Sequence, residues 1–105
     1  MIRLDGFEIK RRNETKIFFE GKELCRQYFS TNKITFGTSQ LMPGERGEID
    51  PGHSEAHEVF FVVKGTVVVG DGKGSYVELE EGDAVLILEN VPHQITNISD
   101  KIALV

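Results

Sequence analysis

Three histidines and one nearby glutamate carry most of the metal-binding chemistry that this sequence offers. His53, His57 and Glu58 fall within six residues of one another, and His93 lies far downstream. Imidazole and carboxylate groups together are common ligands of first-row transition metals. Two imidazoles and one carboxylate would leave coordination positions open for water and a small ligand. These residue types therefore predict a divalent-metal site.

The segment that follows the first two histidines must position this site. Residues 59–63 (VFFVV) are β-branched and aromatic and end near Gly65, which predicts a strand with both faces covered. Neighbouring residues of a strand point to opposite faces, so without a bulge only one of His57 and Glu58 can face a common site. Because both faces of the strand are apolar, alternation does not choose between the two.

The rest of the chain predicts short strands that are separated by glycine, proline and asparagine turns. The predicted strands outside 59–63 are Lys16–Glu20, Glu23–Phe29, Lys33–Met42, Thr66–Val69, Tyr76–Leu79, Ala84–Leu88, His93–Asn97 and Lys101–Val105. Three glycines in residues 70–74 predict a turn, and no helical sequence follows them to make a phosphate-binding loop. No amphipathic helix is expected. The pattern predicts one all-β domain over residues 1–105, a sandwich or a barrel.

Composition and charge exclude several partners. The 105 residues are 39% apolar, with no run long enough for a transmembrane helix and no signal peptide at the N-terminus. A net charge of −5 argues against a nucleic-acid partner, and we interpret the short basic cluster 10–12 as solvated surface. Cys25 is the only cysteine, which fits a buried strand residue in a reducing cytoplasm. We therefore expect a cytoplasmic protein without membrane or nucleic-acid partners.

The order of residues from 52 to 97 resembles the two sequence motifs of the cupin superfamily. The residues that fit are His53, Glu58 and Gly65 in the first motif (52–65), and Gly82, His93 and Asn97 in the second motif (82–97). The resemblance implies a double-stranded β-helix, also called a jelly roll or cupin barrel. Either motif alone would be a weaker indication of this fold than the two together.

The chain departs from the family pattern at three positions. Pro51 stands where the first histidine of the motif pair belongs, and proline has no side chain to offer a metal. Leu88 and Asn90 replace a proline and a glycine of the second motif, and asparagine tolerates the left-handed conformation that a glycine would take. The missing histidine leaves three alternatives: a site with three ligands, substitution by His57, or loss of the metal.

The resemblance also implies roles for particular residues. His53, Glu58 and His93 are the expected ligands of Fe, Mn, Ni or Zn, with His57 as the alternative to Glu58. The residues that we expect to line the substrate pocket are Phe36, Gln40, Phe60 and Val62. The only phenols and therefore candidate proton donors are Tyr28 and Tyr76, and we interpret Asp50 and Glu55 as solvated loop residues. Asn97 is expected to close a turn or a strand end.

These expectations lead to a hypothesis and an alternative. The hypothesis is a small metal-binding cupin that binds, and as an enzyme would transform, an oxygen-rich molecule such as a sugar derivative or an organic acid. The alternative is a non-catalytic cupin without metal, either a small-ligand binder or a dimeric sensor or structural module. Cupins often pair by their sheets, so a homodimer is expected, with the apolar faces of the strands that begin at Val59 and Ala84 as its contact.

Overall fold

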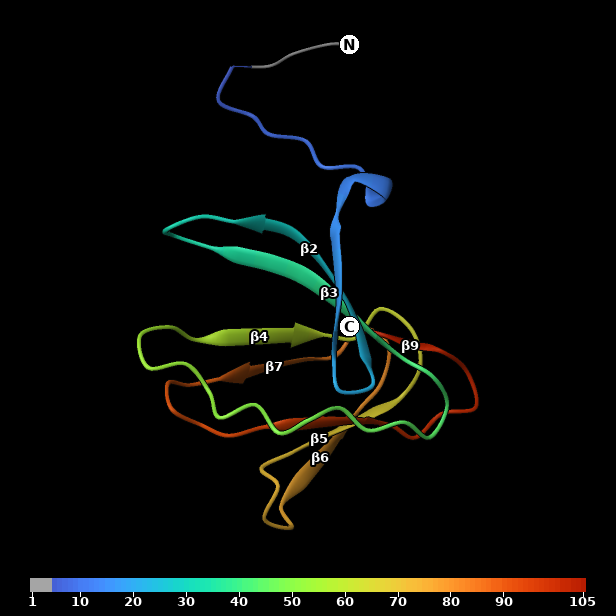
Figure 1. Cartoon of the computed structure of the whole chain (residues 1–105). Coiled ribbons are helices and arrows are strands. Elements are labelled where there is room, and N and C mark those ends of the chain that lie inside the picture. The colour runs from blue at the N-terminus through green and yellow to red at the C-terminus, as the bar shows by residue number, and fades with distance from the viewer. Residues whose placement is uncertain (1–4) are drawn as a thin grey trace.

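The computed structural model describes residues 5–105. The first four residues lie outside the described residues, and the expectation about a signal peptide falls partly on them. The regular secondary structure of the described part consists of strands and one short 3-10 helix, η1 (Arg12–Glu14). Its strands are β1 (Lys16–Glu20), β2 (Glu23–Ser30), β3 (Thr35–Leu41), β4 (Glu58–Phe61), β5 (Val67–Gly70), β6 (Tyr76–Leu79), β7 (Ala84–Ile87), β8 (Gln94–Asn97) and β9 (Ala103–Leu104) (Figure 1). This architecture confirms the all-β prediction.

The strands form three antiparallel groups that isolated bridges join into a jelly roll. The orders are β1-β2-β3-β9, β4-β7 and β6-β5-β8. A bridge between Lys64 and Leu104 links the end of β4 to β9. Two further bridges, from Arg46 to Thr96 and from Asp50 to His93, lay the loop after β3 along β8. These links bring the chain around residue 50 beside the second motif.

A small apolar core lies between the sheets. Its members are Leu41, Val62, Val67, Val69, Leu79, Ile95 and Ala103. In β5, Val67 lies opposite Leu79 of β6 and Val69 lies opposite Ile95 of β8, so one face of the central strand points into the core. Cys25 is also buried, as its interpretation as a small strand residue predicts.

Two backbone positions hold the two motif loops together. Gly52 has a φ of +92°, and a Cβ there would lie 2.8 Å from the backbone nitrogen of Val91. The Asn90 N–H donates to the His53 carbonyl at 2.8 Å, and Asn90 itself has a φ of 60°. The prediction that Asn90 takes a left-handed conformation is therefore confirmed. The loops that carry His53 and His93 touch because Gly52 has no side chain.

Asn97 ties the end of β8 to its surroundings. Its side chain is fully buried, and its amide donates to the Leu41 carbonyl at 3.0 Å and to the Lys101 carbonyl at 2.7 Å. Its Oδ1 accepts hydrogen bonds from the backbone and hydroxyl of Ser99. Every polar atom of the side chain thus has a partner, which a buried amide requires. The interpretation of Asn97 as a residue that closes a turn is confirmed.

The strand predicted at 59–63 differs from expectation in one respect. We predicted that both faces would be covered, but Val59 and Phe61 of β4 are exposed, and so is their neighbour Leu86 of β7. The structure therefore covers only the face that carries Glu58 and Phe60. The expectation was wrong because β-branched and aromatic residues indicate a strand without showing which of its faces other elements cover. No helix among residues 5–105 is long and apolar enough to cross a membrane.

Candidate metal centre

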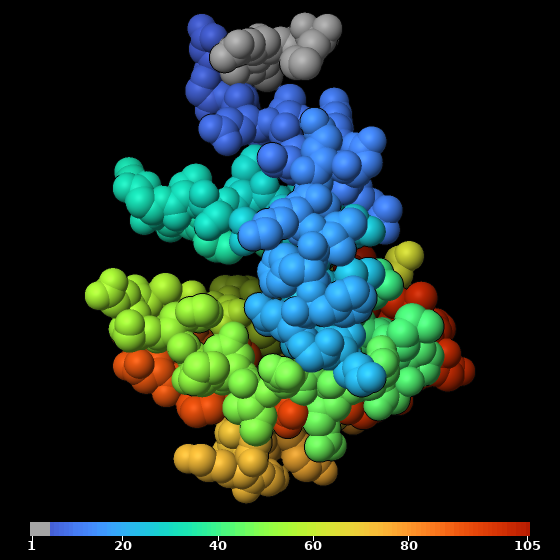
Figure 2. Space-filling view, viewed as in Figure 1, coloured from blue at the N-terminus to red at the C-terminus, as the bar shows by residue number. Residues whose placement is uncertain are grey.

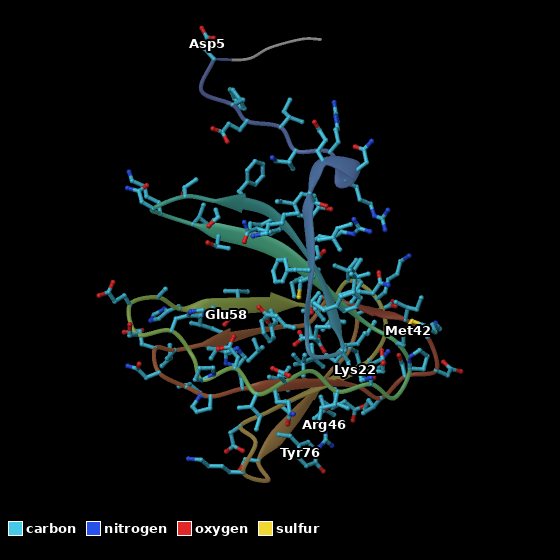
Figure 3. The ribbon with its side chains drawn as sticks, in the orientation of Figure 1. Asp5, Lys22, Met42, Arg46, Glu58 and Tyr76 are labelled. Atoms are coloured by element: carbon cyan, nitrogen blue, oxygen red, sulfur yellow. The ribbon has the colours of Figure 1, made fainter. Side chains whose placement is uncertain are left out.

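Glu58 and His93 meet between the two motif loops. Glu58 is the first residue of β4 (Figure 3), and His93 directly precedes β8. Glu58 Oε1 lies 3.1 Å from His93 Nε2, and the two side chains are 27% and 5% exposed. Although both atoms are buried, their geometry does not form a hydrogen bond, and no other group among residues 5–105 forms one with either atom. Such unpaired buried atoms are rare in folded proteins and point to a further binding partner.

The other ring nitrogen of His93 indicates the tautomer of the neutral imidazole. Nδ1 lies 2.9 Å from the Val91 carbonyl, which can only accept a hydrogen bond, so we assign the proton to Nδ1. In the neutral ring, Nε2 then presents a lone pair to the carboxylates. Phe60 packs its ring edge-on to the imidazole, with centroids 5.4 Å apart, and holds the orientation. A lone pair that faces carboxylate oxygens requires a proton or a cation between them.

Asp50 brings a second carboxylate to the same place. Its Oδ2 lies 3.7 Å from His93 Nε2, while its Oδ1 accepts a hydrogen bond from the Gly52 backbone at 2.8 Å. The backbones of Asp50 and His93 exchange two hydrogen bonds, of 2.8 and 2.9 Å. One ligand atom each from Asp50, Glu58 and His93 lies within 4.8 Å of the others. We call these three residues the Asp50–Glu58–His93 cluster.

Sequence reasoning missed Asp50, which we interpreted as a solvated loop residue. The structure places its carboxylate in the cluster instead. One signal was available, because Asp50 immediately precedes Pro51, the position where the motif histidine is missing. A donor next to an unfilled ligand position is a natural substitute for it.

The two remaining histidines lie in different environments. His53 Nε2 is 3.4 Å from Glu58 Oε1, and its side chain lies half exposed at the rim of the cluster. His57 is directed to the Glu89 carboxylate at the surface. The structure therefore brings His53 to the cluster and leaves His57 outside it.

The residues predicted to line the pocket are also dispersed. Phe60 contacts His93, whereas Val62 is fully buried in the apolar core. Phe36 and Gln40 lie on the face of β3 opposite to the buried Leu41. Of the four, the structure places only Phe60 against the cluster.

A groove of about 400 Å³ borders His93 on the side of β6 and β7. Residues that line it include Val69, Val77, Val85, Ile87 and Val91. Tyr76 also lies along the groove, while Tyr28 packs edge-on to Phe36 elsewhere. The groove gives a small molecule an apolar wall beside the imidazole.

A buried acid, Glu23 of β2, lies in the electrostatic field of the cluster. Ser39 donates a hydrogen bond of 2.6 Å to Glu23 Oε1, and a side chain at Gly47 would collide with the carboxylate. Burial raises the pKa of Glu23, the hydrogen bond from Ser39 opposes this, and the charges of Glu20 and Asp50 raise the pKa further. Glu23 is therefore a buried acid whose pKa depends in part on the charge of Asp50 in the cluster.

Comparison with known proteins identifies the fold independently. The family model of the cupin domain matches residues 37–105. The chain has no match among curated protein sequences.

Three solved structures illustrate the likeness. A predicted oxalate decarboxylase from Thermotoga maritima is 17% identical, with 92% of this chain and 93% of that chain covered and a TM-score of 0.76. The Fe(II) form of HppE is 20% identical, with 98% and 60% covered and a TM-score of 0.79. CENP-C of Drosophila melanogaster bound to CAL1 is 19% identical, with 91% and 80% covered and a TM-score of 0.74. At these identities the likeness establishes a shared fold.

Proposed function

This chain belongs to the cupin domain family, and from that premise we propose that it is a small metal-binding cupin. The observation that carries the proposal is the pair of buried atoms, His93 Nε2 and Glu58 Oε1, that face each other without hydrogen bonds beside a second carboxylate. The Fe(II) named for HppE supports a metal in this fold. A divalent cation would satisfy all three groups at once.

The ligand set that we propose keeps the predicted residues and adds one. His53, Glu58 and His93 bind the cation, and Asp50 supplies the donor that Pro51 does not provide. Two imidazoles and two carboxylates suit Fe, Mn, Ni or Zn. Such a cation, when bound, supplies a Lewis acid that polarises an oxygen of the ligand. His57 is left out of this set because its ring faces Glu89.

The ligand that we propose is a small, oxygen-rich molecule, such as an organic acid or a sugar derivative. Its oxygen atoms would face the cluster, and its carbon skeleton would lie against Phe60 and the groove beside His93. The alternative is a non-catalytic binding module, and turnover of such acids or sugars would separate the two.

We further propose that the chain is a cytoplasmic homodimer. The single buried cysteine fits a reducing compartment. CENP-C shows a structure of this fold in contact with a protein partner. For the present chain we propose that the partner is a second copy.

Cation binding by variants tests the proposed site. Wild-type protein freed of metal should bind about one Mn²⁺, Fe²⁺, Ni²⁺ or Zn²⁺ per chain in titration calorimetry. At a free concentration 100 times Kd, the cation should stabilise the native state by about 2.7 kcal/mol. His93→Ala should lose both the binding and the stabilisation. The matched control His57→Ala removes an imidazole outside the cluster and should retain both. Equal cation binding by wild type and His93→Ala would refute the site.

A further inference from the structure

The inner face of the β2–β3 hairpin is polar. Cys25 of β2 lies opposite Ser39 of β3, so these two residues share one face. Gln27 lies opposite Gly37 on the same face, two residues further along each strand. Glu23 belongs to this face as well, because its carboxylate accepts the 2.6 Å hydrogen bond from Ser39. At the end of β3 the face continues into the apolar core, so it is the face that points into the jelly roll.

The large apolar side chains of the same sheet lie on its outer face. Ile17 and Phe19 of β1 and Phe36 of β3 are 54%, 69% and 53% exposed. An antiparallel sheet that only covers a core carries its apolar side chains on the inner face and its polar ones outside. The reversed polarity of this sheet indicates that the space beneath the hairpin accommodates a polar occupant.

The candidate metal centre lies on the strand that faces this hairpin. Glu58 begins the inner face of β4 and lies four residues before Val62 of the core, just as Gly37 lies four residues before Leu41 of the core. Figure 2 shows open space between the end of the hairpin and the segment that contains β4, and Figure 3 shows Glu58 below the hairpin. The pair of Gln27 and Gly37 therefore faces Glu58 across an open cleft.

Glu23 gives independent evidence that the hairpin and the cluster border the same space. Burial is the largest cause of the raised pKa of Glu23, and the charges of Asp50 and His93 also act on this carboxyl group. Interactions between charges act over about 10 Å at moderate salt. The inner face of the hairpin therefore lies within electrostatic reach of the cluster.

The side chain of Gln27 is available to a ligand. It is half-buried, and its amide makes no hydrogen bond with any group among residues 5–105. The amide offers donors and an acceptor, and a hydroxyl group can bond to either. Opposite Gln27, Gly37 has no side chain that would fill the cleft.

We propose that Gln27 binds hydroxyl groups of a polyhydroxylated carboxylic acid whose carboxylate lies at the metal centre. Ser39, whose hydroxyl oxygen can still accept a hydrogen bond, extends the polar surface toward the core. The inference rests on the proposed function and narrows it, because it selects acids that carry hydroxyl groups along their carbon chain. An acid without these hydroxyl groups would leave the amide of Gln27 unpaired in the cleft, which costs free energy.

Two six-carbon acids test this specificity. D-Gluconate and 2-hydroxyhexanoate both have a carboxylate and a neighbouring hydroxyl group, so both can chelate a cation in the same way, but only gluconate carries hydroxyl groups on its other carbons. Titration calorimetry of the full chain at saturating Mn²⁺ should give gluconate a Kd about tenfold lower than that of 2-hydroxyhexanoate. Gln27→Leu removes the amide at similar volume. It should raise the Kd of gluconate about tenfold and leave that of 2-hydroxyhexanoate unchanged.

Thr38→Val is the matched control. Thr38 lies opposite Arg26 on the outer face of the hairpin, so loss of its hydroxyl group should leave the Kd of both acids at the wild-type value. Both variants should bind Mn²⁺ as the wild type does, because neither changes a proposed cation ligand. Circular dichroism verifies that each variant is folded, and Gln27→Ala replaces Gln27→Leu if that variant is not.

Three results would overturn the inference: equal Kd values of the two acids for the wild type, no binding of either acid, or a Kd of gluconate that Gln27→Leu leaves unchanged. Failure of the proposed cation site is a separate observation, the absence of Mn²⁺ binding by the wild type. A wild type that binds no Mn²⁺ but prefers gluconate, with the preference lost in Gln27→Leu, would refute the cation site and support the role of Gln27. A wild type that does neither would refute both.

Discussion

At the level of single residues, the most informative position is Asp50. Proline at position 51 removes the expected imidazole, and the neighbouring carboxylate reaches the cluster from a backbone that is hydrogen-bonded to His93. The replacement of an imidazole by a carboxylate makes the site more negative. Carboxylate-rich sites favour harder cations, so Mn²⁺ should bind well relative to Zn²⁺ or Ni²⁺ when compared with a histidine-rich site.

Asp50→Asn tests this role. The substitution keeps the shape and the capacity to accept the Gly52 hydrogen bond but removes the charge. We expect the Kd for Mn²⁺ to rise by about tenfold to 100-fold, measured by titration calorimetry. Glu55→Gln removes a carboxylate from the exposed loop nearby and should leave the Kd unchanged. If Asp50→Asn bound Mn²⁺ with the wild-type Kd, Asp50 would not be a ligand, and the interpretation of Asp50 as a solvated loop residue would be correct.

Glu23 predicts a particular dependence of stability on pH. Because burial raises its pKa in the folded state above the ordinary value of 4.5, the native state binds more protons than the unfolded state at pH values between the two. The contribution of Glu23 to stability is therefore present below pH 4.5 and is lost as pH rises through the folded pKa. Glu23→Gln keeps an acceptor for Ser39 and carries no charge.

Urea unfolding of both proteins with a chelator present measures this effect. The stability of Glu23→Gln relative to wild type should be lowest near pH 4, rise with pH and level off above the folded pKa. A difference that stays constant from pH 4 to pH 8 would show that the titration of Glu23 is not coupled to folding.

At the level of elements, the site depends on two loops that touch at Gly52. Both Gly52 and Gly82 have positive φ angles, of +92° and +88°, but only at Gly52 would a Cβ meet the backbone of Val91. Gly52→Ala should therefore destabilise the fold more than Gly82→Ala, by at least about 1 kcal/mol, because φ strain is common to both. Chemical denaturation measures the two values. Equal losses would mean that the loop adjusts without cost and that contact at Gly52 does not position His53 and His93.

At the level of the whole molecule, the sequence predicts most of the architecture. Turn residues and β-branched runs locate the strands, and the two motifs locate His53, Glu58 and His93 near one another. The left-handed Asn90 and the hydrogen-bonded Asn97 are also as predicted. These features depend on local backbone preferences and on motif spacing, which a sequence displays directly.

Two features could not be predicted in this way. Asp50 reaches His93 through a bridge between distant segments, and no local periodicity encodes that pairing. Val59 and Phe61 are exposed because no other element of the described chain covers their face of β4. An apolar sequence pattern does not reveal which elements will pack against it.

We propose that Asp50, Glu58 and His93, together with His53, hold a divalent cation. Anomalous diffraction from crystals of the full chain grown with Mn²⁺ tests it most directly. We expect one strong anomalous peak within bonding distance of His93 Nε2 and of the carboxylates of Glu58 and Asp50. The absence of a peak there, with Mn²⁺ bound only at surface groups such as His57 and Glu89, would contradict it.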